Sequence, residues 1–339
     1  MRLRLTQAAG FEVEGLPFCI DAGRIQPLGI ITHAHTDHAS RHESIVCTPE
    51  TALLLGERWK RLTVRAVPYE QTINLDGARV TLLPAGHILG SAMVLIETGD
   101  TRILFTGDFN TRSSPLHAPA APVHCDVLVM ESTFSRPEFV FPNVERNRQM
   151  MRAFVDAARA SGYTPVLTGY AVGKAQQIVK LLAGYHETIW VHPKIDAFCD
   201  MYRRAGIDLP ETRVPAAGAP PGGLVVMPPN FTRTEWRQRI SKPRVCFCSG
   251  WALDRGRGSF FRSDQIIPLS DHADARGLAE FAQATCAGKV YTMHGSALEL
   301  AEILRGEGID AQSVPDHWQA LRAAEAVQYS AQTLDLFDS

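Results

Sequence analysis

The sequence predicts an α/β fold with at least one parallel sheet. From about residue 143, helical and strand patterns alternate: helices are expected near 144–160, 172–184 and 195–205, and strands at 165–168, 188–191 and 224–227. This alternation is typical of parallel strands covered by helices. Before residue 143, a series of apolar strands is interrupted by turns, and several of these strands end in a residue that can bind metal or carry a proton.

Composition and length are those of a globular protein. The 339 residues are 45% hydrophobic and 21% charged with a net charge of −2, which is long enough for one large domain or two ordinary ones. The seven cysteines are scattered and contain no C-x-x-C pair, so neither a disulfide framework nor a zinc ribbon is expected. With no signal-peptide-like region and no apolar span of 18 residues, a cytoplasmic protein without a membrane partner is expected.

The first elements are short. Residues 1–32 are expected to form strands separated by turns at Gly10, Gly15 and 22–23. Thr48 as N-cap and Pro49 at the first helical position predict a helix that runs to about Leu62.

The densest chemical signal is the segment Ile-Thr-His-Ala-His-Thr-Asp-His at 31–38, which follows an apolar run. His33, His35, Asp37 and His38 place four potential metal ligands within six residues. On an extended segment His33 and His35 share a face, and Asp37 with His38 offers a second pair after the turn. Imidazole and carboxylate suit zinc or another borderline divalent ion. One ion would use some of these groups, and two ions would use them all; a His-rich surface loop is the alternative.

Further candidates lie at the ends of later strands. Strands are expected at 80–83, 93–96, 103–105 and 127–130. His87 and Asp108 each follow a glycine after one of these strands, and Glu131 follows the last of them. Asp21, at an earlier strand end, either braces the metal loop by hydrogen bonds or is an ordinary turn residue. Each would alone be a turn residue, but their repetition after the His/Asp segment favours a site.

The block from 143 to 262 is predicted to be an inserted domain, because ligand-like residues resume after it at 271–272 and at His294. Its part from 232 to 262 carries eight basic and two acidic side chains, with Trp236 and Trp251 available for base or sugar contact. This favours a phosphate backbone as partner; a solvated basic face is the alternative.

The ordered series of these residues resembles the metallo-β-lactamase fold, and Glu131, His272 and His294 resemble its β-CASP nucleic-acid-processing branch. The resemblance covers most of the chain. It implies a four-layer αββα sandwich from residues 1–142 and 263–339, with an inserted α/β β-CASP domain at 143–262.

The resemblance also implies a site with two divalent metal ions, zinc in the first place and manganese as the alternative. One ion would be held by His33, His35 and His87, the other by Asp37, His38 and His294, and Asp108 would bridge them. Asp21 would brace the loop. Glu131 would hold His272, which would contact the scissile phosphate and protonate the leaving oxygen, in agreement with what phosphodiester hydrolysis requires.

The segments 105–109, 170–174 and 249–251 resemble Artemis-type and cross-link-repair DNA exonucleases, and the length resembles bacterial ligase-associated DNA exonucleases. The expected function is therefore 5′-to-3′ digestion of DNA, single-stranded or with a free 5′-phosphate end, in repair and alongside DNA ligase or helicase partners. Because many Artemis-type relatives lack the histidine at the position of His294, an RNA-processing endonuclease or exonuclease is the alternative. A small-molecule hydrolase and an inactive binding scaffold are less favoured.

Two kinds of partner contact are predicted. Lys174 at a helix start and Ser249 with Gly250 would bind a terminal phosphate, although a helix N-terminus and a tight turn explain them equally well. Further nucleic-acid contacts are expected from residues of the basic run, namely Trp251, Arg237, Arg239, Arg255 and Arg257. A charged helix is expected near 316–327, and the tail from Gln332 to Phe337 after it resembles the short peptides that bind bacterial sliding clamps.

Overall fold

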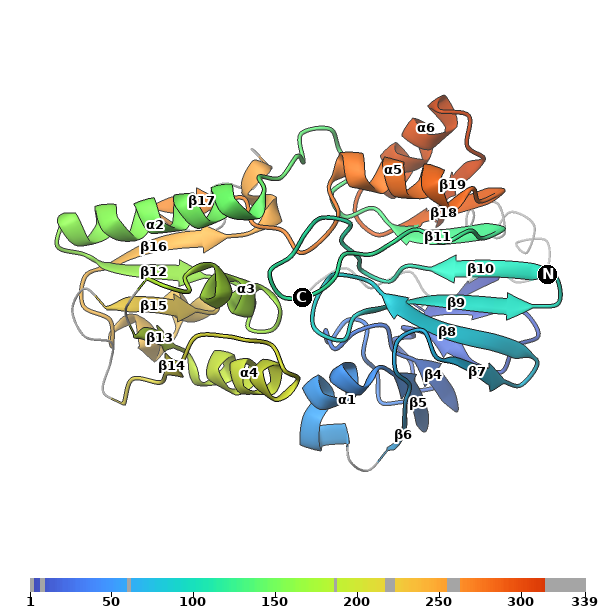
Figure 1. Cartoon of the computed structure of the whole chain (residues 1–339), viewed down its shortest axis with the longest axis horizontal. Helices are drawn as coiled ribbons and strands as arrows, with labels where there is room; N and C mark the ends of the chain where they lie inside the picture. Colours follow the sequence, from blue (N-terminus) through green and yellow to red (C-terminus); the bar gives the residue numbers. More distant parts are fainter. Residues whose placement is uncertain are drawn as a thin grey trace, which may run out of the picture.

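The computed structural model describes residues 3–6, 10–59, 62–185, 188–216, 223–254 and 263–314. The predicted helix at 316–327, the tail at 332–337, and Arg255 and Arg257 lie outside these residues. Within them the predicted α/β class is confirmed: three sheets are combined with helices on several of their faces (Figure 1).

The first sheet is formed by the N-terminal strands in sequence order. Its strands are β1 (Leu3–Thr6), β2 (Gly10–Val13), β3 (Cys19–Ile20), β4 (Leu28–Ile30), β5 (Ser44–Cys47) and β6 (Thr63–Ala66). The pairs from β1 to β3 are antiparallel, and the pairs from β3 to β6 are parallel.

The second sheet has the order β19-β18-β11-β10-β9-β8-β7. Its strands are β7 (Thr72–Leu75), β8 (Ala78–Pro84), β9 (Ala92–Thr98), β10 (Thr101–Phe105), β11 (Val127–Glu131), β18 (Lys289–Met293) and β19 (Ala311–Ser313). Residues 143–267 are called the central block here. β11 pairs in parallel with β18, so residues on either side of the central block become neighbours in one sheet.

The two sheets pack face to face, since Ile30 and Val46 of the first share an apolar core with Val80 and Phe105 of the second. On the other face of the first sheet, Ile45 packs with α1 (Pro49–Leu55). Helices α5 (Ala275–Thr285) and α6 (Ala297–Gly306) cover the outer face of the second sheet (Figure 1). The order of layers is thus helix, sheet, sheet, helix; its assignment to the metallo-β-lactamase architecture stays a prediction.

The third sheet is parallel throughout and belongs to the central block. Its order is β14-β13-β15-β12-β16-β17, with β12 (Thr164–Thr168), β13 (Ile189–Val191), β14 (Thr212–Arg213), β15 (Leu224–Met227), β16 (Pro243–Cys248) and β17 (Gln265–Ile267). One face packs with α2 (Val144–Ala160), α3 (Lys174–Leu181) and α4 (Pro193–Arg204). The first and second sheets with their helices are called the two-sheet part here. The core of the third sheet continues into Ile88 and Leu89 of the two-sheet part, so the central block packs on the two-sheet part through an apolar contact.

Three sequence predictions need correction. α1 ends at Leu55 and is followed by a 3-10 turn at Gly56–Trp59 instead of reaching Leu62, because Gly56 adopts a φ of 64° and its N–H caps Ala52 O. β17 pairs with β16, so the third sheet extends past the predicted boundary at 262. Trp236 is 9% exposed and packs in the core on the other face of the third sheet, where it cannot stack on a base.

None of the described helices is long and apolar enough to cross a bilayer.

Candidate active site

Asp21 makes hydrogen bonds to the loop that follows β4. Its backbone has a φ of 47°, and the residue is 3% exposed. The carboxylate accepts from Thr32 N at 2.8 Å and from Thr32 Oγ1 at 2.6 Å, and it lies 2.8 Å from Nδ1 of His38. An ionised carboxylate only accepts, so His38 donates from Nδ1 and its Nε2 is left to face the site. These hydrogen bonds are the ones that the predicted bracing of a metal loop by Asp21 requires, and that role stays a prediction.

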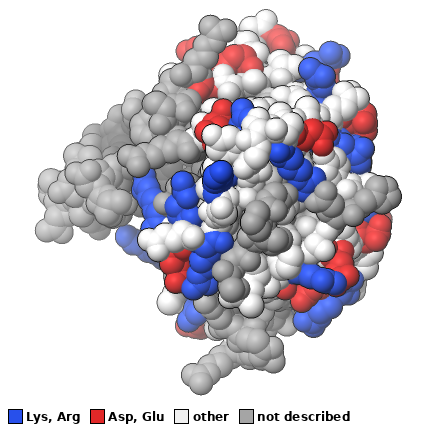
Figure 2. Space-filling view, turned by 90° about the vertical axis from the view of Figure 1, so that its left-hand side faces the viewer, with Lys and Arg blue, Asp and Glu red and all other residues white. Residues whose placement is uncertain are grey.

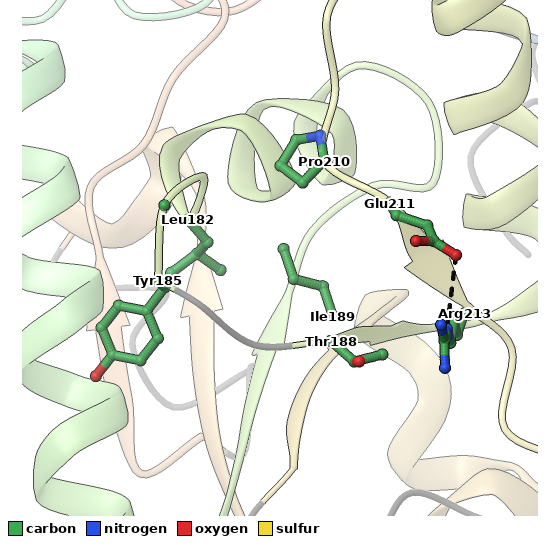
Figure 3. Close-up of a pocket in the computed structure, with 8 residues that line it drawn as sticks. Leu182, Tyr185, Thr188, Ile189, Pro210, Glu211 and Arg213 are labelled. Carbon is green, nitrogen blue, oxygen red and sulfur yellow. Dashed lines mark ion pairs between the residues drawn. The ribbon is translucent and has the colours of Figure 1, made fainter.

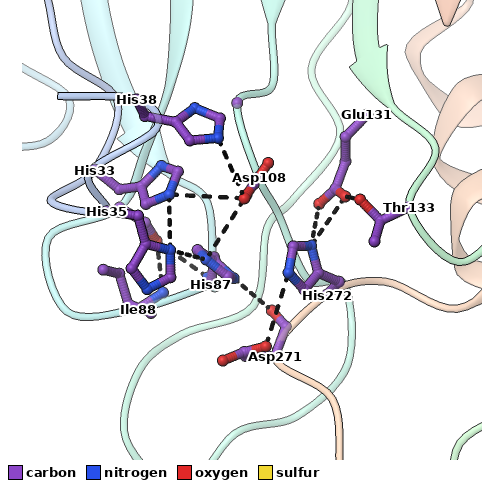
Figure 4. A network of polar contacts seen from close by, with 12 residues as sticks. His33, His35, His38, His87, Ile88, Asp108, Glu131, Thr133, Asp271 and His272 are labelled. Atoms are coloured by element: carbon purple, nitrogen blue, oxygen red, sulfur yellow. Dashed lines mark hydrogen bonds and ion pairs between the residues drawn. The ribbon is translucent and has the colours of Figure 1, made fainter. Parts of the chain in front are cut away.

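Four side chains of the predicted set converge around Asp108 (Figure 4). Asp108 Oδ2 lies 3.6 Å from His33 Nε2, 3.5 Å from His38 Nε2 and 3.7 Å from His87 Nε2. Nδ1 of His35 lies 3.1 Å from His33 Nε2 and 3.2 Å from His87 Nε2. His33, His35, His87 and Asp108 thus offer one ligand atom each within 4.8 Å of one another.

The histidines of this cluster differ in protonation. Burial and the neighbouring imidazoles lower the pKa of His33 and of His87 well below 6.5, so both rings are neutral near pH 7. Burial raises the pKa of Asp108, but the positive charges of His38 and His272 outweigh it and hold that pKa below its ordinary value. Burial lowers the pKa of His38, but Asp108 and Asp21 outweigh burial and raise it to about 10, so His38 would lose its Nε2 proton on binding a metal ion. Neutral His33 and His87 beside an ionised Asp108 are donors that suit zinc or a similar divalent ion.

The residues of the second predicted metal position lie at the open edge of the cluster. The ring centroid of His294 is 5.9 Å from that of His38, although β5 to β18 and the whole central block separate them in sequence. Asp37 Oδ2 is 3.9 Å from His38 Nε2. Asp37 and His294 are both exposed, so this position opens to solvent. The structure brings the predicted residues together, and their roles as ligands stay a prediction.

Buried Glu131 pairs with partly exposed His272 beside the cluster. Both carboxylate oxygens of Glu131 lie 2.9 Å from His272 Nδ1, and Glu131 also accepts from Phe109 N at 2.7 Å and Thr133 Oγ1 at 2.5 Å. The His272 ring centroid lies 4.4 Å from that of His87. Burial lowers the pKa of His272, but the charge of Glu131 and its hydrogen bond outweigh burial and raise it to about 9.

Lys174 does not have the predicted environment of a phosphate ligand. It is 2% exposed, and its Nζ lies 2.8 Å from Asp271 Oδ1. The prediction rested on its place at the start of α3, but that end of the helix is buried against the two-sheet part. The spacing of residues in the sequence could not predict that Lys174 is buried or that it pairs with Asp271, because the two residues come from distant segments.

The predicted anion site at Ser249 and Gly250 is also internal. Ser249 is buried, and its hydroxyl accepts from Trp251 N at 3.3 Å. A Cβ on Gly250 would lie 2.4 Å from Phe134 Cζ, so the turn packs closely on that ring. Trp251 is half-buried against Phe134, with ring centroids 4.8 Å apart. Since Phe134 in turn contacts His272, this turn borders the active site through aromatic packing.

The two described arginines predicted to contact nucleic acid are exposed. Arg239 pairs with Glu235 at 2.9 Å and lies over the Trp236 ring, and Arg237 is exposed two residues away. Figure 2 views the central block end-on and shows lysine and arginine side chains interspersed with acidic ones. The local basic excess therefore does not form an uninterrupted patch on the described part of this face.

One surface pocket lies away from these residues. It has a volume of about 390 Å³ and is lined by the end of α3, β13 and β14, with Tyr185, Ile189, Glu211 and Arg213 among its residues (Figure 3). None of the predicted site residues lines it.

Comparison with known proteins finds relatives whose names refer to enzymes of nucleic acids. The chain is 34% identical over 308 residues to a protein of Opitutus terrae named probable DNA ligase. The aligned region covers 90% of this chain and 30% of that protein. It is 32% identical over 145 residues to endoribonuclease YSH1 of Yarrowia lipolytica, covering 42% of this chain and 17% of that protein. The chain thus spans less than a third of the length of these curated relatives.

The fold is shared with a solved structure. A crystal structure of a protein of unknown function from Enterococcus faecalis V583 superposes with a TM-score of 0.53 at 13% identity, over 80% of this chain and 76% of that one. No family model matches the sequence.

Proposed function

We propose that the chain is a metal-dependent phosphodiesterase of the metallo-β-lactamase fold with a β-CASP insertion. The observation that carries the proposal is the Glu131–His272 pair beside the His/Asp cluster. The cluster alone would serve many hydrolases, whereas a histidine held by a buried carboxylate next to it supplies the proton that an alkoxide leaving group needs.

In this proposal, one group of residues binds the metal ions and another positions the proton donor. His33, His35 and His87 would hold one ion, Asp37, His38 and His294 the other, and Asp108 would bridge; when bound, the ions supply a water nucleophile and neutralise charge on the phosphate. Glu131 is itself fixed by Phe109 N–H and Thr133 Oγ1, and it orients His272 through Nδ1. The Nε2–H of protonated His272 is then available to the leaving oxygen.

The proposed substrate is DNA, single-stranded or with a free 5′ end, degraded from a 5′-phosphate in the 5′-to-3′ direction during repair. Support comes from the relative named probable DNA ligase, because 90% of this chain aligns with it. A nuclease domain joined to a ligase would prepare ends for joining. RNA is the second candidate, because other relatives are named endoribonucleases and because His294 is present.

The proposed setting is a cytoplasmic protein that works with DNA ligase or helicase partners. Residues 1–142 and the segment after β17 would form the metallo-β-lactamase domain, and the block between them the β-CASP domain. The tail from Gln332 to Phe337 would bind the sliding clamp.

One assay tests substrate, polarity and metal together. Matched single-stranded DNA and RNA, each with a 5′-phosphate or a 5′-hydroxyl, are incubated with metal-free protein reloaded with zinc or with manganese. We expect mononucleotides to be released first from the 5′-phosphorylated DNA end. Equal degradation of 5′-phosphate and 5′-hydroxyl strands would refute the end requirement, and preferential cleavage of RNA would favour the second candidate.

A further inference from the structure

A buried ion pair joins the central block to the segment that carries His272. Lys174 is the first residue of α3, and Asp271 immediately precedes His272. Lys174 Nζ and Asp271 Oδ1 are 2.8 Å apart, and their side chains are 3% and 13% exposed. A charge buried to this extent is costly without its partner, so each residue restricts the position of the other.

Asp271 in turn contacts two histidines of the active site. Its backbone oxygen lies 3.1 Å from His87 Nδ1, which donates to it, and this contact turns His87 Nε2 towards Asp108. Its carboxylate Oδ1 lies 3.8 Å from His272 Nε2 (Figure 4). Partners of this kind fix the tautomer and the ring orientation of a ligating histidine.

The close approach of α3 to the site depends on Gly173. Its φ is 86°, and a Cβ there would lie 2.3 Å from Cγ2 of Ile88, the residue after His87, and 3.5 Å from Asp271 Oδ2. The preceding residue, Val172, has its backbone oxygen 3.5 Å from His35 Nε2. Residues 172–174 of the central block therefore border two proposed metal ligands, His35 and His87.

We infer that Lys174 is a positioning residue that acts through Asp271 to orient His87 and His272. Docking of the central block thereby sets the metal affinity of the cluster as well as the position of the proton donor. The inference rests on the proposed metal site, and it assigns Lys174 a structural partner within the protein in place of a substrate phosphate.

Lys174→Met tests this, because methionine fills similar space without a charge. Affinity of the metal-free full-length chain for Zn²⁺ and Mn²⁺ is measured by competition with a chromophoric chelator, beside kcat and KM on 5′-phosphorylated DNA. We expect metal affinity about 10- to 100-fold weaker and kcat reduced, with KM unchanged. Lys180→Met is the matched control, since Lys180 lies on the same helix and pairs with the exposed Asp208; it should behave as wild type.

Two results would overturn the inference: wild-type metal affinity in Lys174→Met, or a raised KM with unchanged metal affinity, which would indicate a phosphate contact. Since Lys174→Met leaves Asp271 buried without its partner, melting temperatures are recorded, and Lys174→Met/Asp271→Asn provides a second variant with both charges removed. Wild-type affinity in that double variant would overturn the inference too. Metal binding is measured without cleavage, so a wild-type chain that binds metal but cleaves no nucleic acid would refute only the proposed function, whereas one that binds neither ion would refute both.

Discussion

Glu131→Gln tests the proposed proton donor directly. Glu131 is 1% exposed, and its carboxylate accepts from both His272 Nδ1 and Phe109 N. Glutamine has nearly the same shape but is uncharged, and only one end of its amide accepts hydrogen bonds. Phe109 N and His272 Nδ1 both contact Oε1, so an amide oxygen at that position still accepts from both. His272 then loses its contact with the second oxygen and the negative charge that holds it.

The size of the effect follows from the charge that is lost. A hydrogen bond to a charged group contributes about 1.5–3 kcal/mol and a neutral one about 0.5–1.5 kcal/mol, so the variant loses about 1–1.5 kcal/mol. Each 1.36 kcal/mol corresponds to a factor of ten in rate, so kcat should fall about 5- to 13-fold. KM and metal content should not change, because Glu131 belongs to neither the predicted ligand set nor the predicted nucleic-acid contacts.

Single-turnover cleavage of a 5′-phosphorylated oligonucleotide measures this effect. A second substrate carries a bridging sulfur in place of the leaving oxygen, and a thiolate leaves without protonation. The defect of Glu131→Gln should shrink on this substrate, and an equal defect on both would refute proton donation by the pair. Glu280→Gln, at an exposed ion pair on α5, is the control and should match wild type on both substrates.

Further predictions concern metal, loop and tail. Asp108→Ala should abolish cleavage while binding of the oligonucleotide, followed by fluorescence anisotropy, survives; persisting cleavage would refute the metal assignment. Dialysis against a chelator should stop cleavage and lower the melting temperature, and zinc or manganese at 100 times Kd should restore about 2.7 kcal/mol of stability. Asp21→Asn should weaken metal binding about 10- to 100-fold in chelator competition, with an unchanged circular dichroism spectrum. Deleting 332–339 should remove sliding-clamp binding in a pull-down and leave cleavage of short oligonucleotides intact; clamp binding that survives would exclude the tail motif.

The strands of the two-sheet part could be predicted because their signal is local. The runs at 80–83, 93–96, 103–105 and 127–130 lie within β8, β9, β10 and β11. Each is largely buried, so its residues are apolar regardless of which strand pairs with which. β17 was missed because it is three residues long with only Ile267 buried, and its place at the edge of the third sheet depends on pairing with β16.

In the candidate site, too, residues with a local sequence signal could be predicted, and contacts between distant segments could not. His33, His35 and His38 share one loop, and His87 and Asp108 follow β8 and β10 of one sheet. Their repetition at strand ends favoured a site, and the family resemblance placed them in one ligand set. The environment of Lys174 was not predictable, because its position at a helix start is the same for an exposed anion site and for a buried ion pair. Only the docking of the central block decides between the two.

That docking gives the two halves of the metal cluster different supports. His33 and His38 are held by Thr32 and Asp21, which belong to the first sheet and its loop. His35 and His87 instead contact Val172 O and Asp271 O, which lie in and directly after the central block. A disturbance of the interface between the parts should therefore weaken the ligands His35 and His87 before His33 and His38. The central block would then help to build the proposed metal site, in addition to any contact with substrate.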